Sequence, residues 1–350
     1  MLNLTIEQIK AALPDALAIR AGLNPPMPHP LAEPLSEAPL SVFAKAAGAL
    51  IAESNPHRRP ADPRAYIAMG YNSSDFQLVL SDALRRLVVI RYQQESEHRG
   101  LCKDIPVQNF KPVNLPSIDV NLDLDELNEG AEYRSGAILL ERAGETAQLH
   151  TLARDVRITR HAIQNDDLGI IEAIFTGFGA AASRAEAQAL YGLLEANGDL
   201  ADEAPVFDAV FGNVTAEAFG ETGVGEAIEL LRKQESEGGN VINARARHLV
   251  VAADLELAAH KLVRDCGLRL DVIATPWLPD GRYYVKADAE MFPVLGRLYL
   301  GRDNRDKTSV IVGAVRRQAG GAEFDGIRLG VRADQAVTLM GRVGIVRGGA

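Results

Sequence analysis

Two glycine-containing motifs in the sequence approach known phosphate-binding patterns. Gly177, Gly179 and Ala182 satisfy the dinucleotide fingerprint G-x-G-x-x-A, which places a pyrophosphate on a helix N-terminus. That fingerprint requires a preceding strand, whereas residues 170–176 follow helical spacing. Residues 301–308 read GRDNRDKT and approach the phosphate loop GxxxxGK(S/T), but Asp306 replaces the required second glycine and would repel phosphate. We therefore predict a helix interior and a charged loop.

The histidines, serines and cysteines form no catalytic or metal-binding pattern. The seven histidines include no HExxH pair, and no G-x-S-x-G elbow presents an activated serine. His150 and His161 flank a predicted strand close to Asp155 and Asp166, where we interpret them as ordinary residues. Cys102 and Cys266 lie far apart and indicate reduced thiols without a structural zinc site. We predict no catalytic, cofactor-binding or metal-binding residues, and no enzyme.

Paired carboxylates lie instead on a predicted β-ribbon between Ser117 and Ile158. Apolar residues at 118, 120, 122 and 124 alternate with polar residues at 119, 121, 123 and 125, a pattern typical of a half-buried strand. Alternation resumes at Leu149, Thr151 and Ala153 and then shifts phase to Val156, as a β-bulge would cause. The pattern predicts a long two-stranded finger. A ribbon of this kind cannot cover its own apolar face and needs a partner.

The finger is strongly acidic. Between Asp119 and Glu145 it carries eight acidic residues against two arginines. We expect it to contact another subunit through Asp119, Asp123, Asp125, Glu126, Glu129, Glu132 and Arg134, on a basic surface. The alternative is a solvated acidic hairpin without a partner.

The elements around the finger mix helices and strands. Many prolines between residues 24 and 63 predict an extended arm around one helix at Ser41–Glu53. Helices are also expected from Ser73 to about Tyr92, and from a cap at Asn165–Asp167 to about Glu195, ended by Asn197 and Gly198. The later chain predicts a helix near Gly225–Glu235, a strand at His248–Val251, a helix capped by Asp254, and then an antiparallel meander at Leu268–Ala274, Arg282–Lys286, Arg297–Leu300, Ser309–Arg316, Ile327–Val331 and Ala336–Val346, with a turn at Asp280–Gly281. This order is typical of an α+β fold.

Composition restricts the possible partners. The 350 residues are 47% hydrophobic and only 5% aromatic, so a large aromatic-lined ligand pocket is not expected. A formal charge of −10 opposes tight DNA wrapping and docking on an anionic membrane. Residues 1–20 are amphipathic without a secretory core, and no apolar run approaches the roughly 20 residues of a membrane span.

Four stretches resemble the tailed-bacteriophage major capsid family with the Hong Kong 97 fold, in its Mu-like branch. They read SSDFQLVLSDALRRLV (Ser73–Val88), ARDVRITRHAIQNDDL (Ala153–Leu168), ARHLVVAADLELAAHKLV (Ala246–Val263) and FDGIRLGVRADQAVTLMGRVGIVR (Phe324–Arg347). The resemblance implies an N-terminal arm (1–72), an extended loop (116–152), a peripheral domain with a long spine helix (73–115, 153–200 and 296–350) and an axial domain (201–295).

The resemblance further implies a major capsid protein that assembles with itself into hexamers and pentamers of an icosahedral shell around double-stranded DNA. Scaffold or protease, portal and decoration proteins would be its partners, and it would assemble in the bacterial cytoplasm and reside in the virion. The acidic finger would lie over an adjacent subunit, and Arg302, Arg305, Lys307, Arg316 and Arg317 are the predicted basic docking surface. No lysine occurs between Lys111 and Lys233, so we expect a shell without lysine–asparagine cross-links.

Two alternatives remain open. An encapsulin-type nanocompartment shares this fold but encloses protein, and a cytoplasmic nucleotide-binding enzyme would use the Gly177 segment. Nuclease-protected DNA in purified particles would distinguish a phage capsid from an encapsulin-type compartment. Particle size would distinguish a shell protein from an enzyme, which would be a discrete monomer or dimer.

Overall fold

We describe the fold from a computed structural model of the chain. The structure describes residues 6–25, 27–38, 74–115, 119–120, 138–139, 144–159, 168–235, 241–302, 304–314 and 326–349, with isolated positions between 42 and 69 and Gly239. Within the helix predicted at Ser41–Glu53, the described positions 42, 45, 48, 49 and 52 are helical. The cap predicted at Asn165–Asp167 lies outside the described residues.

The chain divides into two compact units. Unit 1 comprises residues 1–96, 151–184 and 308–334, and unit 2 comprises residues 97–150, 185–307 and 335–350. Helix α7 (Leu168–Ala196) and strand β12 (Gly326–Leu339) each contribute to both units. The mixture of helices and sheets in both units confirms the predicted α+β class.

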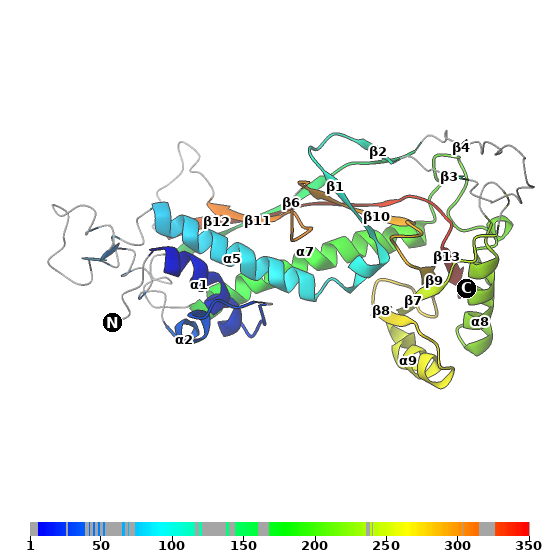
Figure 1. The fold of residues 1–350 in the computed structure, drawn as a ribbon, viewed down its shortest axis with the longest axis horizontal. Helices are drawn as coiled ribbons and strands as arrows, with labels where there is room; N and C mark the ends of the chain where they lie inside the picture. Colours follow the sequence, from blue (N-terminus) through cyan, green and yellow to red (C-terminus); the bar gives the residue numbers. More distant parts are fainter. Residues whose placement is uncertain are drawn as a thin grey trace, which may run out of the picture. The chain divides into compact units, whose positions relative to one another are not determined.

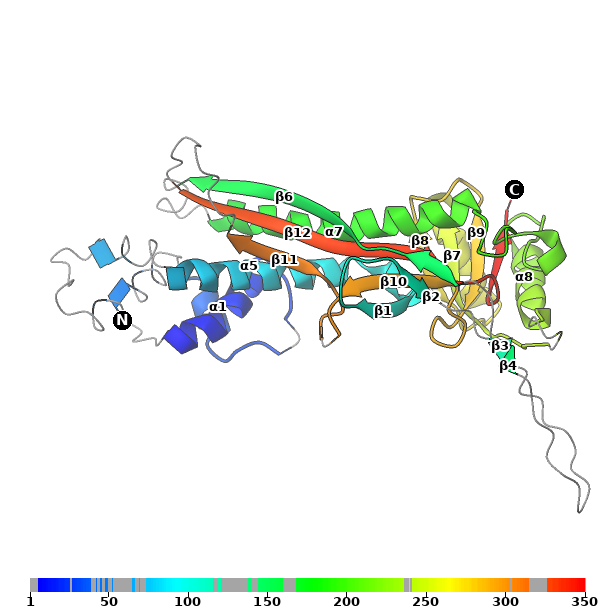
Figure 2. The same ribbon diagram turned by 90° about the horizontal axis from the view of Figure 1, so that it is seen from above.

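Unit 1 packs helices against one face of a sheet (Figures 1 and 2). Its other helices are α1 (Ile6–Arg20), α2 (Ala32–Ser36) and α5 (Ser74–Gln94), and its other strands are β6 (His150–Thr159) and β11 (Val310–Ala314). Both β6 and β11 pair with β12. Alternate β12 residues, such as Leu329 and Val331, are buried in one core with Leu87 and Val88 of α5. The helices predicted from Ser73 and up to about Glu195 are confirmed as α5 and α7.

Helices α1 and α2 fold onto this core. Leu13 and Leu17 of α1 and Leu35 of α2 are buried beside α5. The prediction of an extended arm is therefore wrong for residues 27–38. The prolines do not prevent folding because Pro34 lies in the first turn of α2, where a helix does not need the missing N–H.

A four-stranded sheet in the order β13–β9–β7–β8 organises unit 2. Its strands are β7 (Ala246–Ala252), β8 (Asp271–Thr275), β9 (Tyr283–Ala287) and β13 (Ile345–Gly348). Helices α8 (Glu221–Lys233) and α9 (Glu256–Asp265) pack on one face, with α8 beside β13 and α9 beside β8 (Figure 1). The C-terminal end of α7 packs on the other face through Leu190, Tyr191 and Leu194. Short 3-10 helices complete the unit at Glu97–Leu101, Ala209–Phe211 and Ala253–Leu255.

The predicted antiparallel meander is only partly correct. Strand β7 pairs antiparallel with β9 but parallel with β8, and β1 (Lys103–Val107) pairs parallel with β10 (Leu295–Leu300). Parallel neighbours need a crossover connection, which α9 supplies between β7 and β8. The Asp254 side chain makes no capping bond to α9 and accepts the N–H of Gly281 at 3.1 Å instead. Gly281 has φ +78°, which confirms the predicted turn at Asp280–Gly281.

Candidate assembly site

The acidic finger starts from two short antiparallel strand pairs. Strand β2 (Val113–Leu115) pairs with β5 (Glu145–Ala147), and β3 (Asp119–Val120) pairs with β4 (Ile138–Leu139). The return strand differs from the prediction, because within the described residues β6 pairs with β12 and not with β2 or β3 of the outgoing segment. An alternating pattern specifies which face of a strand is buried but not which strand lies beside it. The two-stranded ribbon therefore ends at residue 147 and does not reach Ile158.

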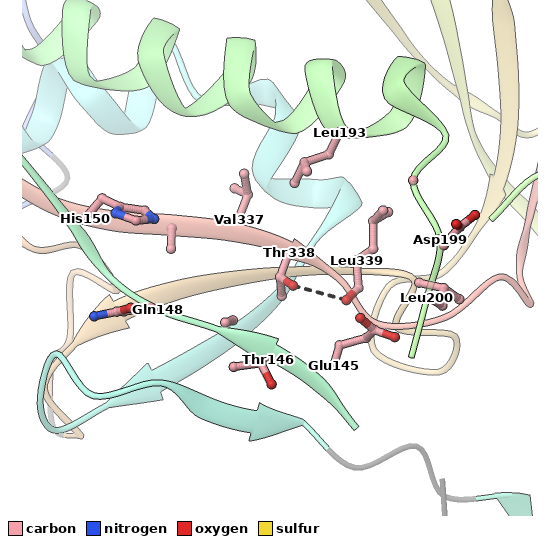
Figure 3. Close-up of a pocket in the computed structure, with 13 residues that line it drawn as sticks. Glu145, Thr146, Gln148, His150, Leu193, Asp199, Leu200, Val337, Thr338 and Leu339 are labelled. Atoms are coloured by element: carbon pink, nitrogen blue, oxygen red, sulfur yellow. Dashed lines mark hydrogen bonds between the residues drawn. The ribbon is translucent and has the colours of Figure 1, made fainter. Parts of the chain in front are cut away.

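A cavity of about 320 Å³ lies at the base of the finger. Figure 3 shows Glu145, Thr146 and Gln148 along one wall and Leu193, Val337 and Leu339 on the other. The Glu145 carboxylate accepts the N–H of Ala201, and the Gln148 amide donates to the carbonyl of Phe110 at 2.9 Å. These hydrogen bonds hold the base of the finger, residues 145–148, beside the cavity.

The structure locates only part of the predicted contact surface. Asp119 is the first residue of β3. The other predicted finger residues lie outside the described part, as do two of the five predicted basic residues: Asp123, Asp125, Glu126, Glu129, Glu132, Arg134, Arg316 and Arg317. Their proposed contacts stay predictions.

The remaining three predicted basic residues share the loop between β10 and β11. Arg302, Arg305 and Lys307 have exposed side chains there. Lys307 is already engaged within the subunit, because its Nζ lies 3.1 Å from a carboxylate oxygen of Asp104. The loop therefore presents two arginines and one lysine that has an internal partner.

Arg297 anchors this loop and was not identified from the sequence. Its guanidinium donates to Asp104 at 2.6 and 2.9 Å and to the carbonyl of Lys307 at 2.6 Å. Glu186 lies 3.4 Å from Arg297 and 3.5 Å from His98, and the side chains of Arg297, Glu186 and His98 are at most 3% exposed. No local pattern marks this network, because its members come from separate elements, η2 (Glu97–Leu101), β1, α7 and β10.

Burial perturbs several ionisable groups near this network. It lowers the pKa of Lys286 to about 8, and Lys286 Nζ donates to the carbonyl of Ala287 at 3.1 Å. Burial lowers the pKa of His248, and the nearby Lys286 cation lowers it further. Burial also raises the pKa of the Cys102 thiol far above its usual range, so the thiol is protonated and unreactive.

The described residues do not support a clustered metal site or either phosphate-binding motif. They contain no group of three or more His, Cys, Asp or Glu side chains that could hold a metal ion. Gly177 and Gly179 lie inside α7, so the dinucleotide fingerprint lacks the strand that it requires. Thr308 leads into strand β11 and not into the helix that follows a phosphate loop. Among the helices described, none has the length and apolarity needed to cross a membrane.

A family model described as phage capsid protein matches residues 144–348, which is more than half of the chain. The chain belongs to this phage capsid protein family. The match confirms the prediction of a phage capsid protein, and it covers β5 through β13. The sequence is not significantly similar to any protein of curated function.

Solved structures similar to this capsid protein include phage proteins and an encapsulin. A phage-related protein from Bordetella bronchiseptica has a TM-score of 0.48 at 11% identity, covering 75% of this chain and 95% of its own. The Synechococcus elongatus encapsulin has a TM-score of 0.45 at 11% identity, covering 70% and 83%. The procapsid of bacteriophage JBD30 has a TM-score of 0.40 at 13% identity, covering 77% and 75%. At identities and TM-scores this low, only the match over residues 144–348 identifies the family.

Proposed function

We propose that this chain is the major head subunit of a tailed phage, with the Hong Kong 97-type fold and without catalytic activity. Copies assemble into hexamers and pentamers of an icosahedral shell that encloses double-stranded DNA. The family match over residues 144–348 carries the proposal. The subunit becomes part of the virion after assembly in the host cytoplasm, with scaffold or protease, portal and decoration proteins as its partners.

The acidic finger supplies the contact between copies. In the described part of the chain, β3 pairs with β4 alone. A two-stranded ribbon is at best marginally stable in water, so the surface of a neighbouring copy would stabilise it. The eight acidic residues between Asp119 and Glu145 require that surface to be basic.

Expression of the full chain tests this function. We expect megadalton particles by light scattering and closed shells in electron micrographs. A discrete monomer or dimer under all conditions would contradict the proposal. Particles formed in the presence of the phage's packaging proteins should contain nuclease-protected DNA, whereas an encapsulin-type compartment would contain protein cargo instead.

The shell should be held together without covalent links. The finger has no amine to donate, because no lysine lies between Lys111 and Lys233. Subunits boiled in detergent should therefore run as a single band of monomer size. Ladders of linked subunits would show that this part of the proposal is wrong.

A further inference from the structure

One face of the unit 1 sheet carries arginines and is open to solvent. On β12, Leu329, Val331 and Ala333 point into the core, so Arg328, Arg332 and Asp334 lie on the opposite face. On β6, Thr151 contacts Asp334 and Asp155 contacts Arg328, which places the odd-numbered β6 residues on that face too. We call this surface the open sheet face; it comprises Thr151, Ala153, Asp155, Arg157, Ile311, Arg328, Arg332 and Asp334.

Most of the open sheet face is exposed in the described part of the chain, although Asp334 is buried within it. Ala153, Asp155 and Arg157 of β6 are exposed. The side chains of Arg328 and Arg332 are 39% and 50% exposed. Ile311 of β11 pairs with Arg332 and is 37% exposed, so an apolar side chain lies between the charges. The strands therefore present a mixed surface in which arginines outnumber carboxylates.

Neighbouring carboxylates, one on β6 and one on β12, fix the positions of these arginines. Arg328 Nε lies 2.6 Å from the Asp155 carboxylate. Asp334 is fully buried and accepts from the Thr151 hydroxyl at 2.7 Å, while Arg332 Nε lies 3.2 Å from its other oxygen. A guanidinium has five donors in a fixed fork, so one bond through Nε leaves capacity for a second carboxylate. Side chains already held in place lose less entropy when a partner binds.

The acidic finger segment matches this surface in charge and in spacing. It holds eight acidic residues and two arginines between Asp119 and Glu145. Arg328 and Arg332 are four residues apart in one strand, which corresponds to about 13 Å. Asp119 and Asp123 are also four residues apart in a segment predicted to be a strand. Carboxylates at that interval can therefore reach both guanidinium groups together.

We propose that the open sheet face, and not the loop at residues 301–307, receives the acidic finger segment of a second copy. This inference rests on the proposed function. Both surfaces hold cations that are paired within the subunit, so pairing does not distinguish them. The loop is the weaker acceptor because residues 301–307 (GRDNRDK) offer no apolar side chain for the ribbon to cover. The open sheet face instead combines fixed arginines with Ile311 and Ala153, which the ribbon's apolar side chains can cover.

Two complementary charge reversals in the full chain test the proposal. Variant A carries Asp119→Lys and Asp123→Lys. Variant B carries Arg328→Glu and Arg332→Glu, with Asp334→Asn so that no buried carboxylate faces a new glutamate. Each variant alone places like charges together, so we expect the assembled fraction to fall about tenfold or more. A mixture of A and B should assemble to a greater extent than either variant alone, because a finger can then find an oppositely charged face on a copy of the other variant.

The mixture also shows whether the bound finger belongs to the same chain or to another copy. If the segment bound the face of its own chain, mixing A and B would not restore assembly. Combining both sets of substitutions in one chain would restore it. That pair of results would overturn the proposal. Normal assembly of B alone would overturn it as well. If B melts below wild type, Arg328→Gln with Arg332→Gln replaces it, and the same loss of assembly is expected with the fold intact; normal assembly of this neutral variant overturns the proposal.

Reversal of the loop is the matched control. Arg302→Glu with Arg305→Glu should assemble like wild type. If this variant fails and A rescues it, the loop is the acceptor and the open sheet face is not. Failure of the wild-type chain to form particles would instead contradict the proposed function, so the two failures are distinguishable.

Discussion

The guanidinium of Arg297 lies 3.4 Å from the carboxylate of Glu186, and the two side chains are 2% and 1% exposed. Arg297 also donates to Asp104 and to the carbonyl of Lys307. One buried cation thus joins α7, β1 and the β10–β11 loop. A buried charge of this kind is tolerated only when its partners are close, so each member depends on the others.

Replacement of Arg297 by methionine should strongly destabilise the subunit. The change leaves Glu186 buried without its cation and removes the donor to Asp104. We expect a loss of about 3–5 kcal/mol in the free energy of unfolding, measured by urea denaturation of the unassembled chain. Arg297→Met combined with Glu186→Met should lose less, because no uncompensated carboxylate remains between them. Equal losses in the single and double variants would contradict this explanation.

Lys286 should make the free energy of unfolding depend on pH. Burial lowers the pKa of Lys286 from 10.5 to about 8, so between these values the unfolded chain binds more protons than the folded one. Stability therefore rises with pH across that window, and below pH 8 the full cost of the buried cation remains. At pH 7, Lys286→Met should raise the free energy of unfolding by on the order of 2 kcal/mol.

Thermal melts at pH 7 and pH 10 would measure this dependence. The advantage of Lys286→Met should shrink at the higher pH, where the wild-type amine is neutral in the folded state. Lys261→Met is the control, because Lys261 is exposed on α9 and should behave like wild type at both values. An advantage that did not change with pH would show that packing, and not charge, is responsible.

The long helices were predictable because their signals are local. Periodic apolar residues predicted α5 and α7, and Asn197 ends α7 with φ +47°, the left-handed geometry expected there. Asn197 also bonds the backbone of Phe207 through both side-chain atoms, at 2.7 and 3.0 Å. A residue that tolerates positive φ was visible in the sequence, whereas its distant partner was not.

Contacts between segments far apart in the sequence were not predictable, because sequence signals are local. The alternation in β6 did not reveal that β12 would be its neighbour, and nothing in residues 27–38 indicated that α2 would be covered by α1. Arg297 reads as an exposed strand residue, because the acids that neutralise it lie 193 positions away at Asp104 and in the middle of α7. Burial of such groups depends on tertiary pairing and not on local pattern.

Gly179 should be required for close packing of α7 on α5. A Cβ atom at Gly179 would lie 2.5 Å from the carbonyl oxygen of Val88 and 2.9 Å from Cβ of Arg91. Gly179→Ala should therefore cost about 1–3 kcal/mol of stability through overpacking. Gly177→Ala is the matched control on the same helix: its Cβ would meet nothing within 4 Å, so the change should stabilise by about 0.5–1 kcal/mol. Similar effects from both substitutions would contradict the close approach.

Asp15 should hold the N-terminal helices on the body of unit 1. It is 2% exposed, accepts the N–H of His29 at 2.8 Å, and lies 3.1 Å from Arg86 of α5. Asp15→Ala leaves the His29 N–H without its acceptor and Arg86 without its anion. We expect a loss of about 1–3 kcal/mol in the free energy of unfolding and faster proteolysis within residues 6–38.

Glu33→Ala provides the control for Asp15, because Glu33 is an exposed acid on α2 and its loss should change stability by about 0.5 kcal/mol or less.

The packing of α1 and α2 on α5 predicts that these two helices stay with the subunit after assembly. Their removal would uncover Leu84, Leu87 and Val88 of α5 and take away Arg20, the cation 3.7 Å from the buried Glu172. The intact mass of subunits released from purified particles should therefore include residues 12–35. A mass that begins beyond residue 38, in particles of normal stability, would show that these helices are dispensable to the folded core.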